Sequence, residues 1–384
     1  MKKTLAAVAV LGAFAGSALA ADVTLYGVID TGFNWTQTKT TGLSAKDNFS
    51  MASGQNSGPR FGLKGTEDLG DGWKVGFNLE NSFKSDTGAL EEKGSRLFHR
   101  EALLFVQSPY GELSMGRTGA LDAGTGRYNL MGSGATAMGT GLDMIGKSNK
   151  ILLGTGDRMD NTVTYKSPSF AGLTVYAQAS LKKESVYAET PATIKEATHP
   201  EGSSDADRYY ALGATFSADG LNAGLVVSMN DYSCTELKKD YDDGYTVSGF
   251  VNYDFGMVKP MLAAQYWDNG KVGTYTATNL ITEKAFSVKN TKGYGIVAGA
   301  TAPVLGGLVK VTGGWNDFEA ADSVNPAPDF DGNNWMFGVS YEYSLSKRTM
   351  IYTGAGYMEE KVKVSGDSFK TKTSEVVAGL VHKF

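Results

Sequence analysis

The chain has 384 residues, a formal net charge of −5, 49 glycines and a single cysteine. An acidic chain is a poor general binder of nucleic acid, and one cysteine, Cys234, excludes an intramolecular disulfide. Beyond the first twenty residues no run of eighteen apolar residues occurs, which argues against a membrane-spanning helix.

Residues 1–20 have the features of a cleavable secretory signal. Two lysines precede an apolar run over residues 5–15, and Ala18-Leu19-Ala20 forms an A-x-A cleavage site. The run is shorter than the ~20 residues that a spanning helix needs, which weighs against an N-terminal anchor. Cleavage would leave residues 21–384, and the loss of two lysines with no acid takes the net charge from −5 to −7.

After the signal, every second residue is apolar in many short segments. Examples are Trp73–Glu80, Leu173–Lys182 and Asn334–Tyr343. Alternation with a period of two is typical of a β-strand with one apolar face. Long helical patterns are missing, so the sequence predicts an all-β fold.

The connections between these segments alternate in length. The short turns are Glu67–Gly72, Ser108–Gly111, Ser167–Gly172, Ser217–Gly220, Asp254–Gly256, Ala302–Gly307 and Ser344–Arg348. The longer polar loops are roughly Thr36–Asn56, Lys84–Gly94, Thr118–Arg158, Lys183–Ala206, Asp231–Asp243, Asp268–Thr291, Asp317–Asp331 and Glu359–Thr371. This pattern predicts a 16-stranded antiparallel transmembrane β-barrel with short periplasmic turns and long extracellular loops. Lipid offers no hydrogen-bond partners, so the sheet must close by pairing Val23–Trp35 with the last strand.

Aromatic residues gather near both ends of the predicted strands. Near the long loops lie Trp35, Trp267, Trp315 and Trp335. Near the short turns lie Trp73, Phe170, Phe216, Phe255 and Phe384. A membrane barrel carries two such belts at its two interfaces, whereas a soluble β-sandwich would place aromatic residues in mid-strand.

Alternation also predicts which basic residues face the lumen of the barrel. In the second strand, Phe61 and Leu63 on the lipid side leave Arg60 on the lumen side. By the same rule the inward basic residues are Arg60, Lys64, Lys74, Arg100, Arg158 and Lys166. For Arg100 the prediction depends on Leu103 and Phe105 facing lipid, in a strand that is apolar on both faces.

The third loop, Thr118–Arg158, contains ten glycines and exceeds the ~12–15 residues above which loops without secondary structure become uncommon. It either forms an exterior flap or folds into the lumen, where glycine permits close packing against the wall. Its charged residues include Asp122, Arg127 and Asp143. It contains no phosphate-binding glycine motif, so nucleotide binding is not supported.

Several stretches resemble the Gram-negative general porins, which are trimeric 16-stranded diffusion channels of the outer membrane. Thr24–Phe33 (TLYGVIDTGF) resembles their first strand, and Arg60–Glu80 (RFGLKGTEDLGDGWKVGFNLE) resembles their second and third. Gly111–Arg117 (GELSMGR) and Arg158–Gly172 (RMDNTVTYKSPSFAG) are similar to the flanks of their third loop. The ending His382-Lys383-Phe384 looks like the family's C-terminal signature.

The resemblance implies a homotrimer in outer-membrane lipid and a third loop folded inward as a constriction. It also implies that the barrel-assembly machinery reads His382 and Phe384, although Val381 stands where the family's pattern has arginine. Arg60, Arg100 and Arg158 match wall arginines that the family aligns at its constriction. With the inward lysines and the loop charges, the expected pore-constriction residues are Arg60, Lys64, Lys74, Arg100, Asp122, Arg127, Asp143, Arg158 and Lys166.

We therefore expect one barrel domain, residues 21–384, that passes small hydrophilic solutes and ions with a weak preference for anions. Basic wall residues act at contact range, whereas charges at the mouths are screened within ~8 Å. A channel selective for one small anion or organic acid is the alternative. We expect no enzyme activity and no cofactor or metal, because His99, His199 and His382 form no Ser/His/Asp set at credible spacing and no metal ligands cluster.

Overall fold

The computed structural model describes residues 23–91, 96–135, 137–138, 151–152, 158–183, 201–204, 206–232, 242–278, 285–321, 329–364 and 366–384. The predicted signal at residues 1–20, the loop residue Asp143 and Cys234 lie outside these ranges.

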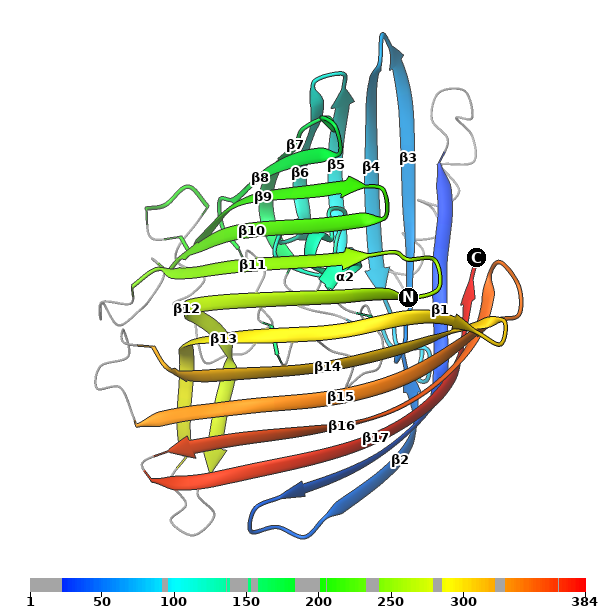
Figure 1. Ribbon diagram of the computed structural model, residues 1–384. Helices are drawn as coiled ribbons and strands as arrows, with labels where there is room; N and C mark the ends of the chain where they lie inside the picture. The colour runs from blue at the N-terminus through cyan, green and yellow to red at the C-terminus, as the bar shows by residue number, and fades with distance from the viewer. Residues whose placement is uncertain are drawn as a thin grey trace, which may run out of the picture.

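Strands make up most of the described chain (Figure 1). They are β1 (Thr24–Thr40), β2 (Lys46–Ser53), β3 (Arg60–Gly70), β4 (Trp73–Ser82), β5 (Glu101–Ser108), β6 (Gly111–Gly119), β7 (Arg158–Lys166), β8 (Leu173–Ser180), β9 (Arg208–Ala218), β10 (Leu221–Asp231), β11 (Gly244–Tyr253), β12 (Lys259–Thr278), β13 (Ala285–Val304), β14 (Gly307–Ala320), β15 (Phe330–Ser344), β16 (Thr349–Val364) and β17 (Asp367–Lys383). A six-residue helix, α2 (Leu130–Ala135), lies in the third loop. Among the residues described, no helix has the length and apolar character to cross a membrane.

Hydrogen bonding closes the strands into one antiparallel barrel. From β3 onward each strand pairs with the next, and β17 pairs with β1 over Val28–Thr40. On its other side β1 pairs with β2 over Thr31–Thr38 and with β3 over Thr24–Val28. The segments β2 and β3 therefore occupy one position in the wall, one after the other. The predicted closed 16-strand barrel is confirmed.

The two faces of the wall differ as the alternation requires. On β1 the large apolar residues Leu25, Ile29 and Phe33 are 41–55% exposed, whereas Val28 and Asp30 between them are buried. Since lipid covers the outside of such a barrel, exposed apolar side chains are the stable arrangement there. The inside holds the polar residues and the third loop.

The predicted aromatic belts form, with one exception. Trp315 and Trp335 are about 40% exposed on the outer face at the long-loop ends, and Phe255 is 61% exposed near a short turn. Trp267 was expected among them, but this prediction was wrong. It has the inward parity of Gln265 on β12, is fully buried, and donates from Nε1 to Thr291 Oγ1 at 3.0 Å.

Several strands run farther than the sequence predicts. The expected first loop, Thr36–Asn56, contains the end of β1 and all of β2. The expected last loop, Glu359–Thr371, is mostly the ends of β16 and β17. These extensions are mostly polar and their apolar residues are few, such as Phe49 and Met51 of β2, so their alternation is weak, yet their backbones still pair across the hairpin.

The described parts of the third loop pack against the inner wall at three places. Leu121 and Leu130 contact a cluster that includes Tyr209 and Val226. Ile151 and Leu152 join a cluster of wall residues from β11 to β16: Phe250, Ala263, Val297, Met336 and Met358. Met138 lies with Val28, Tyr352, Val377 and Val381. The loop is thus inside the barrel, and the apolar core of the molecule lies between it and the wall.

Candidate pore constriction

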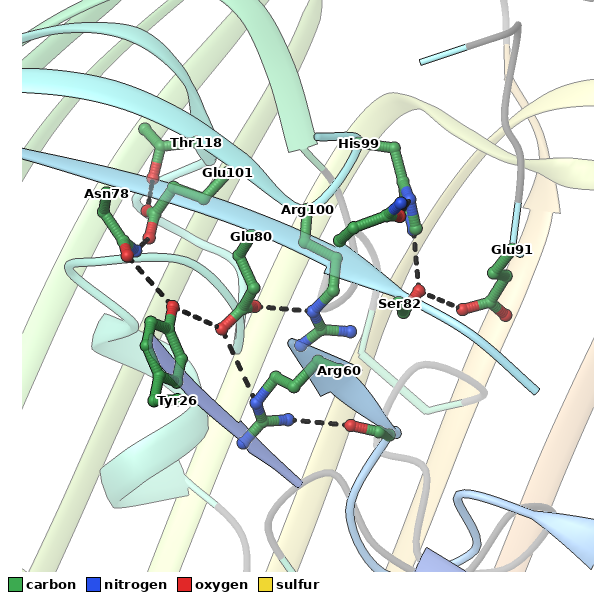
Figure 2. A network of polar contacts seen from close by, with 12 residues as sticks. Tyr26, Arg60, Asn78, Glu80, Ser82, Glu91, His99, Arg100, Glu101 and Thr118 are labelled. Carbon is green, nitrogen blue, oxygen red and sulfur yellow. Dashed lines mark hydrogen bonds and ion pairs between the residues drawn. The ribbon is translucent and has the colours of Figure 1, made fainter. Parts of the chain in front are cut away.

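One carboxylate on the inner wall holds two arginines. Glu80 of β4 accepts a hydrogen bond from Arg100 Nε at 2.6 Å and lies 3.6 Å from Arg60 Nε. Tyr26 donates its hydroxyl to the same carboxylate at 3.0 Å. Figure 2 shows Glu80 between the two guanidinium groups, which approach it from different elements of the wall. Arg60 is the first residue of β3, and Arg100 directly precedes β5.

A third arginine lies close to this pair. Arg158 begins β7, where its backbone is paired with Gly119 at the start of the third loop. It interacts electrostatically with Arg100 and with Glu80. Its Nε atom is buried, and no hydrogen-bond partner for it is present among the described residues. The three predicted wall arginines are therefore brought together around Glu80, which pairs with Arg60 and Arg100.

The third loop adds a paired arginine to the same side of the lumen. Arg127 binds Glu112 of β6 through two bonds, Nε to Oε1 at 2.6 Å and Nη2 to Oε2 at 2.8 Å. Its guanidinium lies over the ring of Phe105 at 3.6 Å from the centroid. Its backbone N–H donates to Glu101 of β5 at 2.8 Å. Arg127 is thus fixed against the wall and its charge is matched by Glu112.

The predicted lysines form no ion pair with Glu80 in the described chain. Lys64 sits over the ring of Tyr26 at 5.2 Å. Lys74 pairs with Asp68 at 3.4 Å, next to the short turn between β3 and β4, and its side chain is 49% exposed. Lys166 is the last residue of β7 and shares the inward parity of the buried Thr164.

Asp122 has a different position from the one expected of a constriction acid. It is buried, and its two carboxylate oxygens accept hydrogen bonds from Tyr209 Oη at 2.8 Å and Ser228 Oγ at 2.6 Å. These partners belong to β9 and β10, so Asp122 fastens the beginning of the third loop to the wall. Asp143, the other acid expected here, lies outside the described residues.

The acids that do accompany the arginines come mainly from the wall, and sequence reasoning missed two of them. Glu101 and Glu112 are buried on the lumen side. The reason is an error in β5: Leu103 and Phe105 were predicted to face lipid, but they are only 2% and 4% exposed, whereas Leu104 is 50% exposed. The correct parity of β5 would have placed Glu101 inside. Arg100 still faces the lumen, because it precedes the strand and bonds to Glu80.

A serine–histidine contact exists, but the other ring nitrogen of the histidine meets an asparagine, so the contact is not a Ser/His/Asp set. His99 Nε2 lies 2.9 Å from Ser82 Oγ, and His99 Nδ1 lies 2.9 Å from Asn81 Oδ1 (Figure 2). Ser82 Oγ also donates to Glu91 at 2.5 Å, and Ser82 and His99 are 1% and 4% exposed. Burial, aided by the positive charge of Arg158, lowers the pKa of His99 to about 4. A serine bonded to a carboxylate and closed to solvent is unsuited to attack a substrate.

Within the described ranges, no group of three His, Cys, Asp or Glu side chains is arranged to hold a metal ion.

Known proteins resemble this chain over its whole length. A family model described as "Gram-negative porin" matches residues 6–363. An outer membrane porin protein of Bordetella pertussis is 32% identical, with all of both chains covered. "Outer membrane porin protein 32" of Delftia acidovorans is 26% identical over 94% of this chain and 90% of its own. Among solved structures, the "Anion-selective porin from Comamonas acidovorans" has a TM-score of 0.63 and 23% identity, over 95% of this chain and 100% of its own.

Proposed function

Because the chain belongs to the Gram-negative porin family, we propose that its wall arginines make the pore weakly selective for small anions. The chain is a multi-pass barrel of the outer membrane that forms a channel for diffusion of small hydrophilic solutes. The observation that carries the proposal is the geometry around Glu80, where one carboxylate serves two arginines and Arg158 forms no ion pair with any described residue.

The net charge of the side chains at the constriction favours the passage of anions, although the chain as a whole is acidic. Arg60, Arg100 and Arg158 exceed Glu80 by two positive charges. The charges of Arg127 and Glu112 cancel each other. The negative charge of Glu101 offsets part of the excess positive charge of the three arginines. Charges at the mouths are screened over ~8 Å of salt solution, whereas an ion that passes the arginines meets them at short range. The porin of the same fold that is named anion-selective agrees with this proposal.

The remaining roles in the proposal concern assembly. We infer a homotrimer embedded in outer-membrane lipid, with His382 and Phe384 presented to the barrel-assembly machinery. The channel passes its solutes unchanged, and the pair Ser82–His99 has a structural role in the segment before β5. Chemical crosslinking of the refolded protein, with a band at three times the chain mass, tests the trimer.

Reversal potentials across a salt gradient test the selectivity. Replacing Arg158 by Ser removes one charge from the constriction and should lower the anion-to-cation permeability ratio by roughly two- to threefold, the combined effect on anion and cation of one charge ~7 Å away in water that is screened by ~0.1 M salt. Replacing Glu80 by Gln should raise the ratio. Lys347→Ser, in an exposed short turn, is the control and should leave it unchanged. A wild-type pore with strong cation selectivity would refute the proposal. A current that saturates with one small carboxylate would favour the alternative of a substrate-selective channel.

A further inference from the structure

A short stretch of chain between β2 and β3 does not fit into the sheet. The last pair between β1 and β2 is Thr31 with Ser53, and the nearest pair between β1 and β3 is Val28 with Arg60. Between these two pairs β1 has two residues, whereas the neighbouring chain has the six residues 54–59. An ordinary β-bulge accommodates one extra residue, so a surplus of four must leave the plane of the wall.

Both ends of this stretch remain in the wall. The Gly54 N–H donates to the Asp30 carbonyl at 3.0 Å, and the Pro59 carbonyl accepts from the Phe83 N–H at 3.2 Å. A Cβ atom on Gly54 would lie 2.7 Å from Pro59 Cδ, so the two ends lie next to each other. Gly54 has a φ of 72°, which glycine adopts without strain at such a sharp turn. The residues that project from the wall are therefore Gln55–Gly58, which we call the β2–β3 segment.

The β2–β3 segment projects toward the lumen. Asp30 lies on the inner face of β1, because it is 0% exposed and its neighbour Ile29 is 41% exposed on the outer face. The Asp30 Oδ2 atom accepts hydrogen bonds from the backbone N–H groups of Asn56 at 2.7 Å and Ser57 at 2.6 Å. Its Oδ1 atom accepts one from the hydroxyl of Tyr352 on β16 at 2.7 Å. Asp30 therefore fastens the segment to the inner wall.

The β2–β3 segment extends from the arginine cluster to the far side of the barrel seam. At one end, the Gly58 carbonyl accepts from Arg60 Nη1 at 3.0 Å, and a Cβ atom on Gly58 would lie 3.4 Å from Arg100 Nη1. Nearer the other end, Asn56 Nδ2 donates to Glu342 Oε1 of β15 at 2.7 Å. Because β1, β17 and β16 separate β3 from β15 in the wall, the segment crosses the inner face of three strands.

The third loop docks close to the same place. Met138 of this loop lies in the apolar cluster that contains Tyr352, and its sulfur accepts a hydrogen bond from Ser340 Oγ of β15 at 3.2 Å. Tyr352 is also the residue that donates its hydroxyl to Asp30. Two separate parts of the chain, the third loop and the β2–β3 segment, therefore occupy the lumen beside β15 and β16.

We propose that the β2–β3 segment is a second constriction element that limits the size of solutes, and that Asp30 is the residue that positions it. Two consecutive backbone N–H groups directed at one carboxylate oxygen form an anion-binding nest, so Asp30 fixes the path of the backbone itself. Asn56, Ser57 and Gly58 are only partly buried and lie beside the arginines, so a solute that passes the arginines also passes them. Asp30 is fully buried and acts on the width of the pore through the segment.

Single-channel recording of the refolded protein in planar bilayers tests the proposal. Asp30→Asn keeps the size of the side chain but loses its charge and one acceptor atom, although all three of its partners are donors. The occupancy of a wider open level should rise roughly 10- to 100-fold, because hydrogen bonds to a charged group are the stronger ones. Polyethylene glycols too large to enter the wild-type pore should reduce the current of this wider level.

Two further variants separate the position of the segment from the charge of the wall. Asn56→Ala removes the bond to Glu342 and should give the same wider level with a smaller rise in occupancy. Glu375→Gln is the matched control, because Glu375 is another acid of the wall that is 2% exposed, and it bonds to Asn34 rather than to the segment. This control should leave the polymer size limit unchanged.

The polymer size limit decides the outcome. A wild-type size limit in Asp30→Asn, or a change no greater than that of Glu375→Gln, overturns the proposal, because a reversal potential that shifts without a new size limit reports charge alone. If Asp30→Asn does not refold, an unchanged size limit in Asn56→Ala overturns the proposal equally.

Discussion

Glu80 decides how the arginines of the constriction are arranged. Its carboxylate bonds to Arg100 at 2.6 Å and attracts Arg60, so two like charges are held close without being pushed apart. Such a pair would separate if the acid were removed, because like charges on neighbouring side chains repel. Because Glu80 is already paired with Arg60 and Arg100, the charge of Arg158 stays available to the lumen. The same carboxylate therefore lowers the net positive charge and fixes the geometry of what remains.

A second single-residue effect concerns His99, whose titration should be shifted far from the usual range. Burial, with the nearby charge of Arg158 second, lowers its pKa to about 4. The neutral ring is thus favoured in the folded protein, and its full stabilising contribution is present above the unfolded pKa of ~6.5. That contribution declines as pH falls from ~6.5 through 4. NMR of the refolded barrel should show a midpoint for His99 near 4, and a midpoint near 6.5 would contradict the buried position.

The effect of this titration on the segment before β5 can be measured directly. Backbone amides around His99 should exchange faster at pH 4.5 than at pH 7 after correction for the intrinsic pH dependence. In a His99→Gln variant, which cannot titrate, this extra acceleration should be absent. Acceleration that persists in the variant would mean that another group is responsible.

At the scale of elements, the third loop is held to the inner wall by polar bonds as well as apolar contacts. Asp122 binds β9 and β10, and Ile151 accepts a hydrogen bond on its carbonyl from Asn316 of β14 at 3.3 Å. Met138 reaches the wall near β1 and β17. Attachments on opposite parts of the wall make the described loop segments a fixed part of the pore.

Removing one polar attachment should loosen the loop without unfolding the barrel. Tyr209→Phe deletes the hydroxyl that donates to Asp122 and should weaken docking of the loop by about 1–3 kcal/mol, since the lost bond is to a carboxylate. Hydrogen exchange of residues 120–131 should then increase, and open-channel current noise should rise. Tyr210→Phe is a matched control, because Tyr210 is 40% exposed on the outer face. Equal exchange in the two variants would show that the bond does not hold the loop.

Strand patterns explain which parts of the site could be predicted. Where one face of a strand is apolar and the other polar, as around Arg60 in β3, parity alone gave the inward side. In β5 both faces are apolar, because Leu103 and Phe105 are buried on the lumen side, where Arg127 of the third loop covers Phe105, while Leu104 faces lipid. Alternation carries no information there, so Glu101 was missed. The wall attachment of Asp122 depends on Tyr209 and Ser228, which are remote in sequence, and no local signal identifies such partners.

For the molecule as a whole, the pairing of β1 with β17 decides whether a barrel exists. Gly27 and Phe384 exchange two backbone hydrogen bonds of 3.1 Å. The Phe384 ring covers Gly27 so closely that a Cβ atom there would lie 2.3 Å from it. Nearby, buried Asp30 accepts bonds from the backbone of Asn56 at 2.7 Å and Ser57 at 2.6 Å, which ties the segment between β2 and β3 to the seam.

Changing the ring at this seam should impair assembly. Phe384→Ala keeps the backbone bonds but removes the contact with Gly27, and the fraction of heat-modifiable barrel in the outer membrane should fall several-fold. Phe255→Ala, which is 61% exposed near another short turn, controls for loss of a belt aromatic alone. Equal assembly of both variants would argue that the seam has no special need for Phe384. Refolding in detergent, where no assembly machinery is present, separates the packing contribution from recognition.

The seam also sets the order of events when the chain is made. Asn34 Nδ2 bonds to Glu375 Oε1 at 2.9 Å across 341 residues of sequence, so the first strand cannot find its partner until nearly all the chain has been synthesised and exported. Until then the sheet has two open edges, and open edges promote aggregation. Closing so long a loop is also entropically costly and slow. The barrel is therefore completed in one late closing step, and the two edges of the unfinished sheet stay open until that step.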